Sequence, residues 1–145
     1  EAFARVGIGE SDAFIGCWAT KYHYNLLRPV TYINAVIDPN WETVLETPPF
    51  PAYTSGHSND VGAASTILTA LLGDGFAITD HTNDDRGFAP RSFGSFFEAA
   101  DESAISRLYG GIHYRFDIDL GVEQGRCVGR AVNALAFRSV ALAKR

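Results

Sequence analysis

The stretch SRLYGGIHYRFD, from Ser106 to Asp117, interrupts an otherwise apolar segment with polar and charged residues. Apolar residues precede it at close to helical spacing, and two consecutive glycines then interrupt the pattern. His113 and Asp117 are four residues apart, which on a helix places them on one face, one turn apart. A carboxylate there can hold one imidazole nitrogen and leave the other for a ligand. Taken alone, the stretch is equally typical of a helix end whose histidine is hydrogen-bonded within the protein. Arg107 would then form an ion pair with an acid at the surface.

Length and composition bound the class of protein. The chain has 145 residues, enough for one domain with its own core, and a net charge of −5, which disfavours a nucleic-acid partner. Any positive site must therefore be local. The two cysteines, Cys17 and Cys127, form no disulfide framework or zinc pattern. No apolar run approaches the ~18 residues of a membrane span.

Periodicity and breakers predict a single all-α domain over residues 1–145. We expect helices over 10–27, 58–72, 92–108 and 118–144, with Ser58 or Asn59 capping the second and Val140 in the core of the last. The β-branched segment 30–37 is expected to be extended. The proline-rich segment 38–53 is expected to be a long irregular loop, and such loops are often functional.

The first of two further motifs is Lys21, six intervening residues, and then Arg28-Pro29. Lys21 and Arg28 are seven residues apart, so on one helix they face the same side, two turns apart. Two cations so placed can hold a tetrahedral oxyanion at separate oxygens. The alternative is a solvated basic face, which the motif alone does not distinguish.

The second is Thr54-Ser55-Gly56-His57, where the proline-rich loop meets the second predicted helix. A helix N-terminus offers free N–H groups, and Gly56 lets the backbone approach a ligand. His57 can exchange protons near neutral pH, and nearby cations should keep it neutral. We expect it to have no acid facing it, because Asp60 is close in sequence. The alternative is a helix cap followed by a core histidine.

Together the three motifs resemble the signature of vanadium-dependent haloperoxidases and type 2 phosphatidic acid phosphatases. Order and internal spacing agree from about Trp18 to Asp117, and the run from Lys21 to Gly121 is most similar to bacterial haloperoxidase-like proteins. One departure is Thr54, where the family usually has proline. The resemblance implies an all-α helical bundle with a buried oxyanion pocket.

The resemblance also implies a role for each matched residue. The cofactor would be vanadate, with phosphate able to occupy the same site. His113 would bind the vanadium, Asp117 would support His113, and His57 would be the acid–base. The oxyanion would be held by the side chains of Lys21, Arg28, Ser55 and Arg107 and by the backbone N–H of Gly56.

Two chemistries fit this pocket, and we place halide oxidation by hydrogen peroxide first. Trp18 and Phe50 resemble the aromatic residues that line the halide site in the family, although core packing would explain them equally well. The alternative is an acid phosphatase that hydrolyses phosphomonoesters through a phosphohistidine at His113. A third reading is an oxyanion-binding domain without turnover.

The resemblance further implies that this domain is the C-terminal part of a longer chain, because family bundles have more helices before the first motif. We therefore expect Glu1 to be an internal residue and the N-terminal remainder of the precursor to be a partner. Family resemblance alone favours a secreted or periplasmic protein. A homo-oligomer is compatible with the sequence, which names neither the halide nor the organic substrate.

Overall fold

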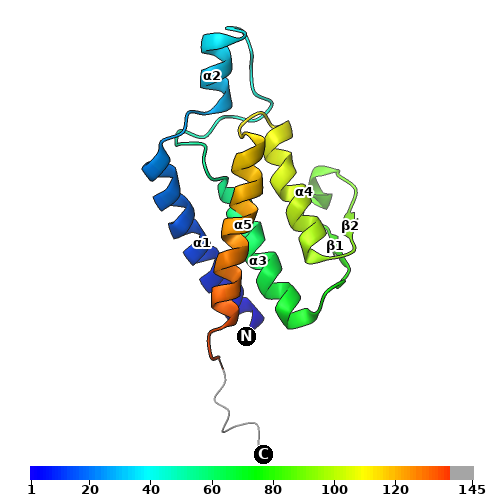
Figure 1. Cartoon of the computed structure of the whole chain (residues 1–145). Helices are drawn as coiled ribbons and strands as arrows, with labels where there is room; N and C mark the ends of the chain where they lie inside the picture. The colour runs from blue at the N-terminus through cyan, green and yellow to red at the C-terminus, as the bar shows by residue number, and fades with distance from the viewer. Residues whose placement is uncertain (138–145) are drawn as a thin grey trace, which may run out of the picture.

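The computed structural model describes residues 1–137 as a bundle of helices with one small hairpin (Figure 1). The prediction of an all-α bundle is confirmed. The elements in chain order are α1 (Ala2–Tyr24), α2 (Pro29–Val36), α3 (Gly56–Leu72), β1 (Ile78–Asp80), η1 (Asp84–Arg86), β2 (Arg91–Phe93), α4 (Phe96–Tyr109) and α5 (Arg115–Asn133).

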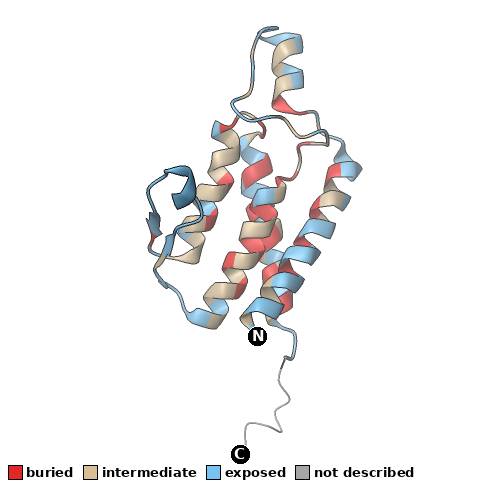
Figure 2. Ribbon diagram, turned by 180° about the vertical axis from the view of Figure 1, so that it is seen from behind, coloured by how far each residue is buried: buried red, intermediate tan, exposed pale blue. Residues whose placement is uncertain are grey.

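Helix α3 is the centre of the bundle, because it packs against α1, α4 and α5. The buried residues follow the inward faces of these helices (Figure 2). The short helix α2 stands beyond one end of the bundle, and the antiparallel β1–β2 hairpin lies beside α4, with Ile78 paired to Phe93 (Figure 1). Within residues 1–137, no helix combines the length and the hydropathy needed to cross a membrane.

The backbones of α3 and α5 approach each other closely, and glycines permit this. A Cβ added at Gly62 would lie 2.6 Å from the carbonyl oxygen of Val122, and one at Gly121 would lie 2.8 Å from Ser58 Cβ. Real Cβ atoms do not come so near, so even alanine would push these helices apart. The register between α3 and α5 is thus fixed by backbone contact.

The first predicted helix differs from α1 at both ends. Helix α1 begins at Ala2 and ends at Tyr24, because Asn25 takes a left-handed conformation with φ of 47° and its N–H bonds to Lys21 O. Arg28 therefore does not share a helix with Lys21, and the prediction that they face one side of it is wrong. The segment after Pro29 is helical rather than extended, since proline is well suited to the first position of a helix.

The other boundaries follow the caps. Ser55, not Ser58 or Asn59, caps α3, and Ser95 caps α4, so the third predicted helix loses its first residues to β2. Helix α5 begins at Arg115 and ends at Asn133, which leaves His113 in the turn before it. The expected core position of Val140 lies outside the described residues.

The α3–α5 contact predicts opposite effects for two glycine substitutions. Gly62→Ala should lower the free energy of unfolding by about 1–3 kcal/mol, because the new methyl group meets the backbone of Val122. Gly7→Ala, at an exposed position of α1 with nothing within 4 Å, should raise it by about 0.5–1 kcal/mol. Urea denaturation of both variants checks this; equal effects would contradict the close packing.

Candidate active site

The N-terminal ends of α3 and α5 meet, and the three sequence motifs meet there with them. The backbone N–H of Ser55 donates to the carbonyl oxygen of Asp117 over 3.0 Å, which ties the start of α3 to the first turn of α5. Ser55 is fully buried and its Oγ accepts from Ser58 N at 3.4 Å as the cap of α3. This junction places the positive ends of two helices side by side.

Two buried cations hold the proline-rich loop over this junction. Lys21 is fully buried, and its Nζ donates to the carbonyl oxygens of Pro51 at 2.9 Å and Ala52 at 3.0 Å. Arg28 Nε donates to Phe50 O at 2.8 Å. Burial lowers the pKa of Lys21 to about 8, and the nearby charge of Arg28 acts in the same direction. Lys21, from α1, and Arg28, from the turn before α2, thus both bind the loop at residues 50–52.

His113 is held at both ring nitrogens. Its Nδ1 lies 3.0 Å from Asp117 Oδ2, so the carboxylate favours the tautomer that carries the proton on Nδ1. Its Nε2 lies 3.1 Å from Arg28 Nη1, which also donates to Ile112 O at 2.8 Å. Burial lowers the pKa of His113 despite the bond to Asp117. The neutral ring therefore directs an unprotonated Nε2 toward the guanidinium.

The expected contact between His113 and Asp117 is present, but its geometry is not the predicted one. His113 precedes α5, and Asp117 is the third residue of that helix. The carboxylate reaches back to accept from the backbone N–H of Tyr114 at 3.2 Å as well as to meet the imidazole. This capping arrangement orients His113 without a shared helical face.

His57 stands opposite Arg107 at the open side of the junction. Arg107 Nη1 lies 3.2 Å from His57 Nε2, which fits donation from the guanidinium to a neutral ring. Partial burial, and then the charge of Arg107, lower the pKa of His57. The neutral state expected for His57 from its cationic neighbours agrees with this direction.

A cavity of about 410 Å³ opens at this place. Of the sequence-predicted residues, its walls include Gly56, His57, Arg107 and His113 together with the halide-pocket candidates Trp18 and Phe50. The rings of Trp18 and Phe50 are 5.0 Å apart, and Phe14 stacks on Trp18 at 4.1 Å. Lys21, Arg28 and Ser55 lie behind these walls rather than in them.

The walls also contain Asp60, which was not among the predicted site residues. Asp60 follows His57 by three residues on α3, and helical residues at that spacing are neighbours on one face. The partner that His57 contacts is Arg107 rather than Asp60, so the expectation that no acid faces His57 stays a prediction. The spacing from His57 was the available signal.

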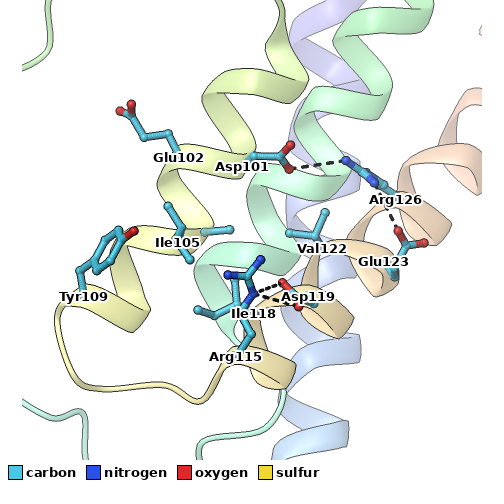
Figure 3. Close-up of a pocket in the computed structure, with 11 residues that line it drawn as sticks. Asp101, Glu102, Ile105, Tyr109, Arg115, Ile118, Asp119, Val122, Glu123 and Arg126 are labelled. Atoms are coloured by element: carbon cyan, nitrogen blue, oxygen red, sulfur yellow. Dashed lines mark hydrogen bonds and ion pairs between the residues drawn. The ribbon is translucent and has the colours of Figure 1, made fainter.

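A larger cavity, of about 590 Å³, lies between α4 and α5 (Figure 3). Its arginines are already paired, Arg115 with Asp119 at 3.0 Å and Arg126 with Glu123 at 3.2 Å. Its walls include no histidine. Because its positive charges are neutralised by adjacent carboxylates, this cavity suits an anion less well than the junction of α3 and α5.

Thr54, the departure from the family motif, joins a buried polar network. Its Oγ1 donates to Gln124 Oε1 at 2.7 Å and accepts from Asn59 Nδ2 at 3.0 Å, and Gln124 Nε2 donates to Thr20 at 3.0 Å. Asn59 Nδ2 also donates to the carbonyl oxygen of Ser55 at 3.0 Å. The network links α1, α3 and α5 directly behind the Ser55-Gly56 turn.

The donor set fits a tetrahedral oxyanion. Arg28 Nη2 is buried and has no hydrogen-bond partner among residues 1–137, so one guanidinium edge is available beside His113 Nε2. Lys21 uses two carbonyl acceptors, and an ammonium group has three donors. In the described part of the chain, no three His, Cys, Asp or Glu side chains cluster as ligands for a metal ion. The residues gathered here are instead cations, N–H groups and the imidazoles of His57 and His113.

Comparison with known proteins identifies the class. The model of the VCPO second helical-bundle domain matches residues 1–141. The chain is 33% identical over 127 residues to the vanadium-dependent bromoperoxidase of Ascophyllum nodosum and 27% identical over 166 residues to the vanadium chloroperoxidase of Curvularia inaequalis. The chain belongs to the family of vanadium-dependent haloperoxidases.

Solved structures agree with this assignment. A crystal structure described as the first bacterial vanadium-dependent iodoperoxidase superimposes with a TM-score of 0.89 at 54% identity, over 93% of this chain and 33% of that one. An apo-type bacterial vanadium-dependent chloroperoxidase, at 20% identity and a TM-score of 0.71, shares the fold over 83% of this chain and 33% of that one. The two curated relatives are matched over 74% and 79% of this chain but only 22% and 27% of their own length.

The lowered pKa of Lys21 predicts a pH dependence of anion binding. Its ammonium group is charged below about pH 8 and neutral above it, so the affinity for phosphate should fall as pH rises from 7.5 to 9.5. Phosphate is predominantly a dianion throughout this range. Isothermal titration calorimetry of the wild type and Lys21→Met measures the affinity for phosphate across this range of pH. Lys21→Met should bind phosphate more weakly, and its affinity should not fall with pH. If the affinity fell equally with pH in both proteins, a group other than Lys21 would be responsible.

Proposed function

We propose that this domain carries a vanadate centre at which halide is oxidised by hydrogen peroxide. The observation that carries the proposal is the setting of His113: Asp117 holds Nδ1, and Nε2 faces a buried guanidinium whose Nη2 has no partner among residues 1–137. An imidazole with its proton held on Nδ1 can bind an electrophilic atom through Nε2. The adjacent guanidinium can then neutralise the negative charge on the oxygens of that atom. The family supports vanadate as the occupant.

Each residue then has a defined task. His113 would bind the vanadium through Nε2, and Lys21, Arg28, Arg107, Ser55 Oγ and the Gly56 N–H would hold the oxygens. Bound vanadate supplies Lewis-acid activation of hydrogen peroxide. His57, neutral before peroxide arrives, accepts a proton from the peroxide through Nε2 when Arg107 turns from the imidazole to the anion, and returns it to the departing oxygen.

The balance of the reaction is one halide, one hydrogen peroxide and one proton giving one hypohalous acid and one water. Iodide is the first halide to test, because the structural relative at 54% identity is named an iodoperoxidase. The relatives named for bromide and chloride are 33% and 27% identical. Trp18 and Phe50, in the cavity wall, would form the apolar side of the halide site.

Phosphomonoester hydrolysis is the second candidate, because the same donors suit a phosphoryl group. An imidazole whose Nδ1 is held by a carboxylate is also a nucleophile, with Nε2 attacking phosphorus and His57 protonating the leaving alcohol. Elemental mass spectrometry for vanadium, with halide oxidation and p-nitrophenyl phosphate hydrolysis assayed side by side, separates the two. Phosphatase turnover without halide oxidation would reject the first proposal.

The two histidines should separate binding from turnover. His113→Ala should lose attachment of the vanadium while Lys21, Arg28 and Arg107 still bind the anion loosely. His57→Ala should keep vanadate and lose about 10²–10⁴-fold in turnover, the usual contribution of an acid–base group. Ultraviolet difference titration with vanadate, run beside the halide assay, measures both effects.

The reverse pattern would show that the roles are exchanged, with His113→Ala active and His57→Ala free of vanadate. A domain that only binds the anion would show no turnover in the wild type and equal vanadate affinity in His57→Ala. Asp12→Asn, a change at an exposed position of α1, is the control for both variants.

A further inference from the structure

Asp60 places a carboxylate in the wall of the cavity where the halide would enter. It shares that wall with His57, Arg107, Trp18 and Phe50. Its Oδ1 is buried and has no hydrogen-bond partner within residues 1–137, and no cation in those residues forms an ion pair with it. A carboxylate oxygen is seldom buried without a hydrogen bond or an ion pair, because a buried charge is costly unless it is paired.

We propose that Asp60 is the charge gate of this cavity, excluding halide ions when ionised and admitting a halide together with a proton. The inference rests on the proposed halide oxidation. The argument is electrostatic: an anion beside a carboxylate in a cavity of reduced dielectric is repelled, and protonation of the carboxylate removes the repulsion. Hydrogen peroxide is neutral and is not affected.

The surroundings of Asp60 shift its pKa toward neutral pH, where its carboxyl group can gain and lose a proton. Burial, and then the charge of Glu10 on α1, raise the pKa of Asp60 to about 6. The other charged or titratable groups of the cavity are His57 from the same helix, Arg107 from α4, Glu46 from the loop before α3 and His113 from the turn before α5. A halide bound beside Asp60 would raise its proton affinity further, by the reciprocity of linked binding.

This coupling has a use in the proposed reaction, which consumes one proton for each halide. Halide entry would bring the proton to Asp60, three residues from the acid–base His57 on the same face of α3. Asp60 Oδ1 makes no hydrogen bond to any residue within 1–137, so we assign Asp60 to the control of access rather than to holding the cofactor.

The test is Asp60→Asn, which keeps shape and removes charge. At pH 8 the variant should lower KM for iodide roughly tenfold, as expected for one unit charge removed at short range, with KM for hydrogen peroxide unchanged. At pH 5, where wild-type Asp60 is protonated, the two proteins should agree. In Glu10→Gln, which keeps Asp60, the pH at which KM for iodide changes should be lower than in the wild type. The substitution removes a neighbouring charge that raises the pKa of Asp60. Asp12→Asn is the charge-matched control away from the cavity.

A second readout needs no turnover. Iodide quenches tryptophan fluorescence on contact, and Trp18 lies in the same wall as Asp60. In a Trp41→Phe background without vanadate, Asp60→Asn should increase iodide quenching several-fold at pH 8 and not at pH 5. If the wild type oxidised no halide while Asp60→Asn still changed the quenching in this way, the proposed function would be rejected and the gate would stand. Unchanged quenching at pH 8, or an unchanged KM for iodide, would overturn the gate.

Discussion

The backbone contact between α3 and α5 is the constraint on which the rest of this structure depends. Gly62 and Gly121 let the two helices approach until no Cβ fits between them, and this contact fixes their register. The N-terminal ends of both helices are thereby held together, with the Ser55 N–H bonded to Asp117 O. His57 and His113, fifty-six residues apart in sequence, owe their common cavity to this junction.

Around the junction the interior is polar, although the cores of domains are usually apolar. Lys21, Thr54, Ser55, Asn59 and Asp117 are almost wholly buried. Fixed partners stabilise Lys21, which donates to loop carbonyls, and Thr54, which joins the Gln124 network. A threonine at the place where the family usually has proline thus adds hydrogen bonds from the loop to α5 and α3.

The motifs and the fold class could be predicted from the sequence because each depends on spacing along the chain. Family membership and the helical bundle are confirmed. Where the predictions fail, a local conformation decides. Asn25 takes the left-handed conformation and ends α1 before Arg28. Helix α5 begins at Arg115, so His113 and Asp117 do not share a helix. The spacing of Lys21 and Arg28 looked helical, yet they converge through a turn.

Other features needed the tertiary structure. Nothing in the sequence shows that Arg107 meets His57 or that Arg28 Nη2 is left without a partner in residues 1–137, since both depend on how distant segments pack. Asp60 is different, because its helical spacing from His57 was visible in the sequence. The roles assigned to the cavity residues remain proposals that the geometry supports.

The two buried cations give the site a thermodynamic role in folding. Lys21 and Arg28 bind four carbonyl oxygens of the chain itself, so the groups that would hold an anion also hold the loop above it. An anion that binds only this folded arrangement stabilises it in proportion to RT ln(1 + [L]/Kd). Inorganic oxyanions in the surroundings would then act on the protein as folding ligands, and the amount of folded protein would depend on their supply before any chemistry takes place.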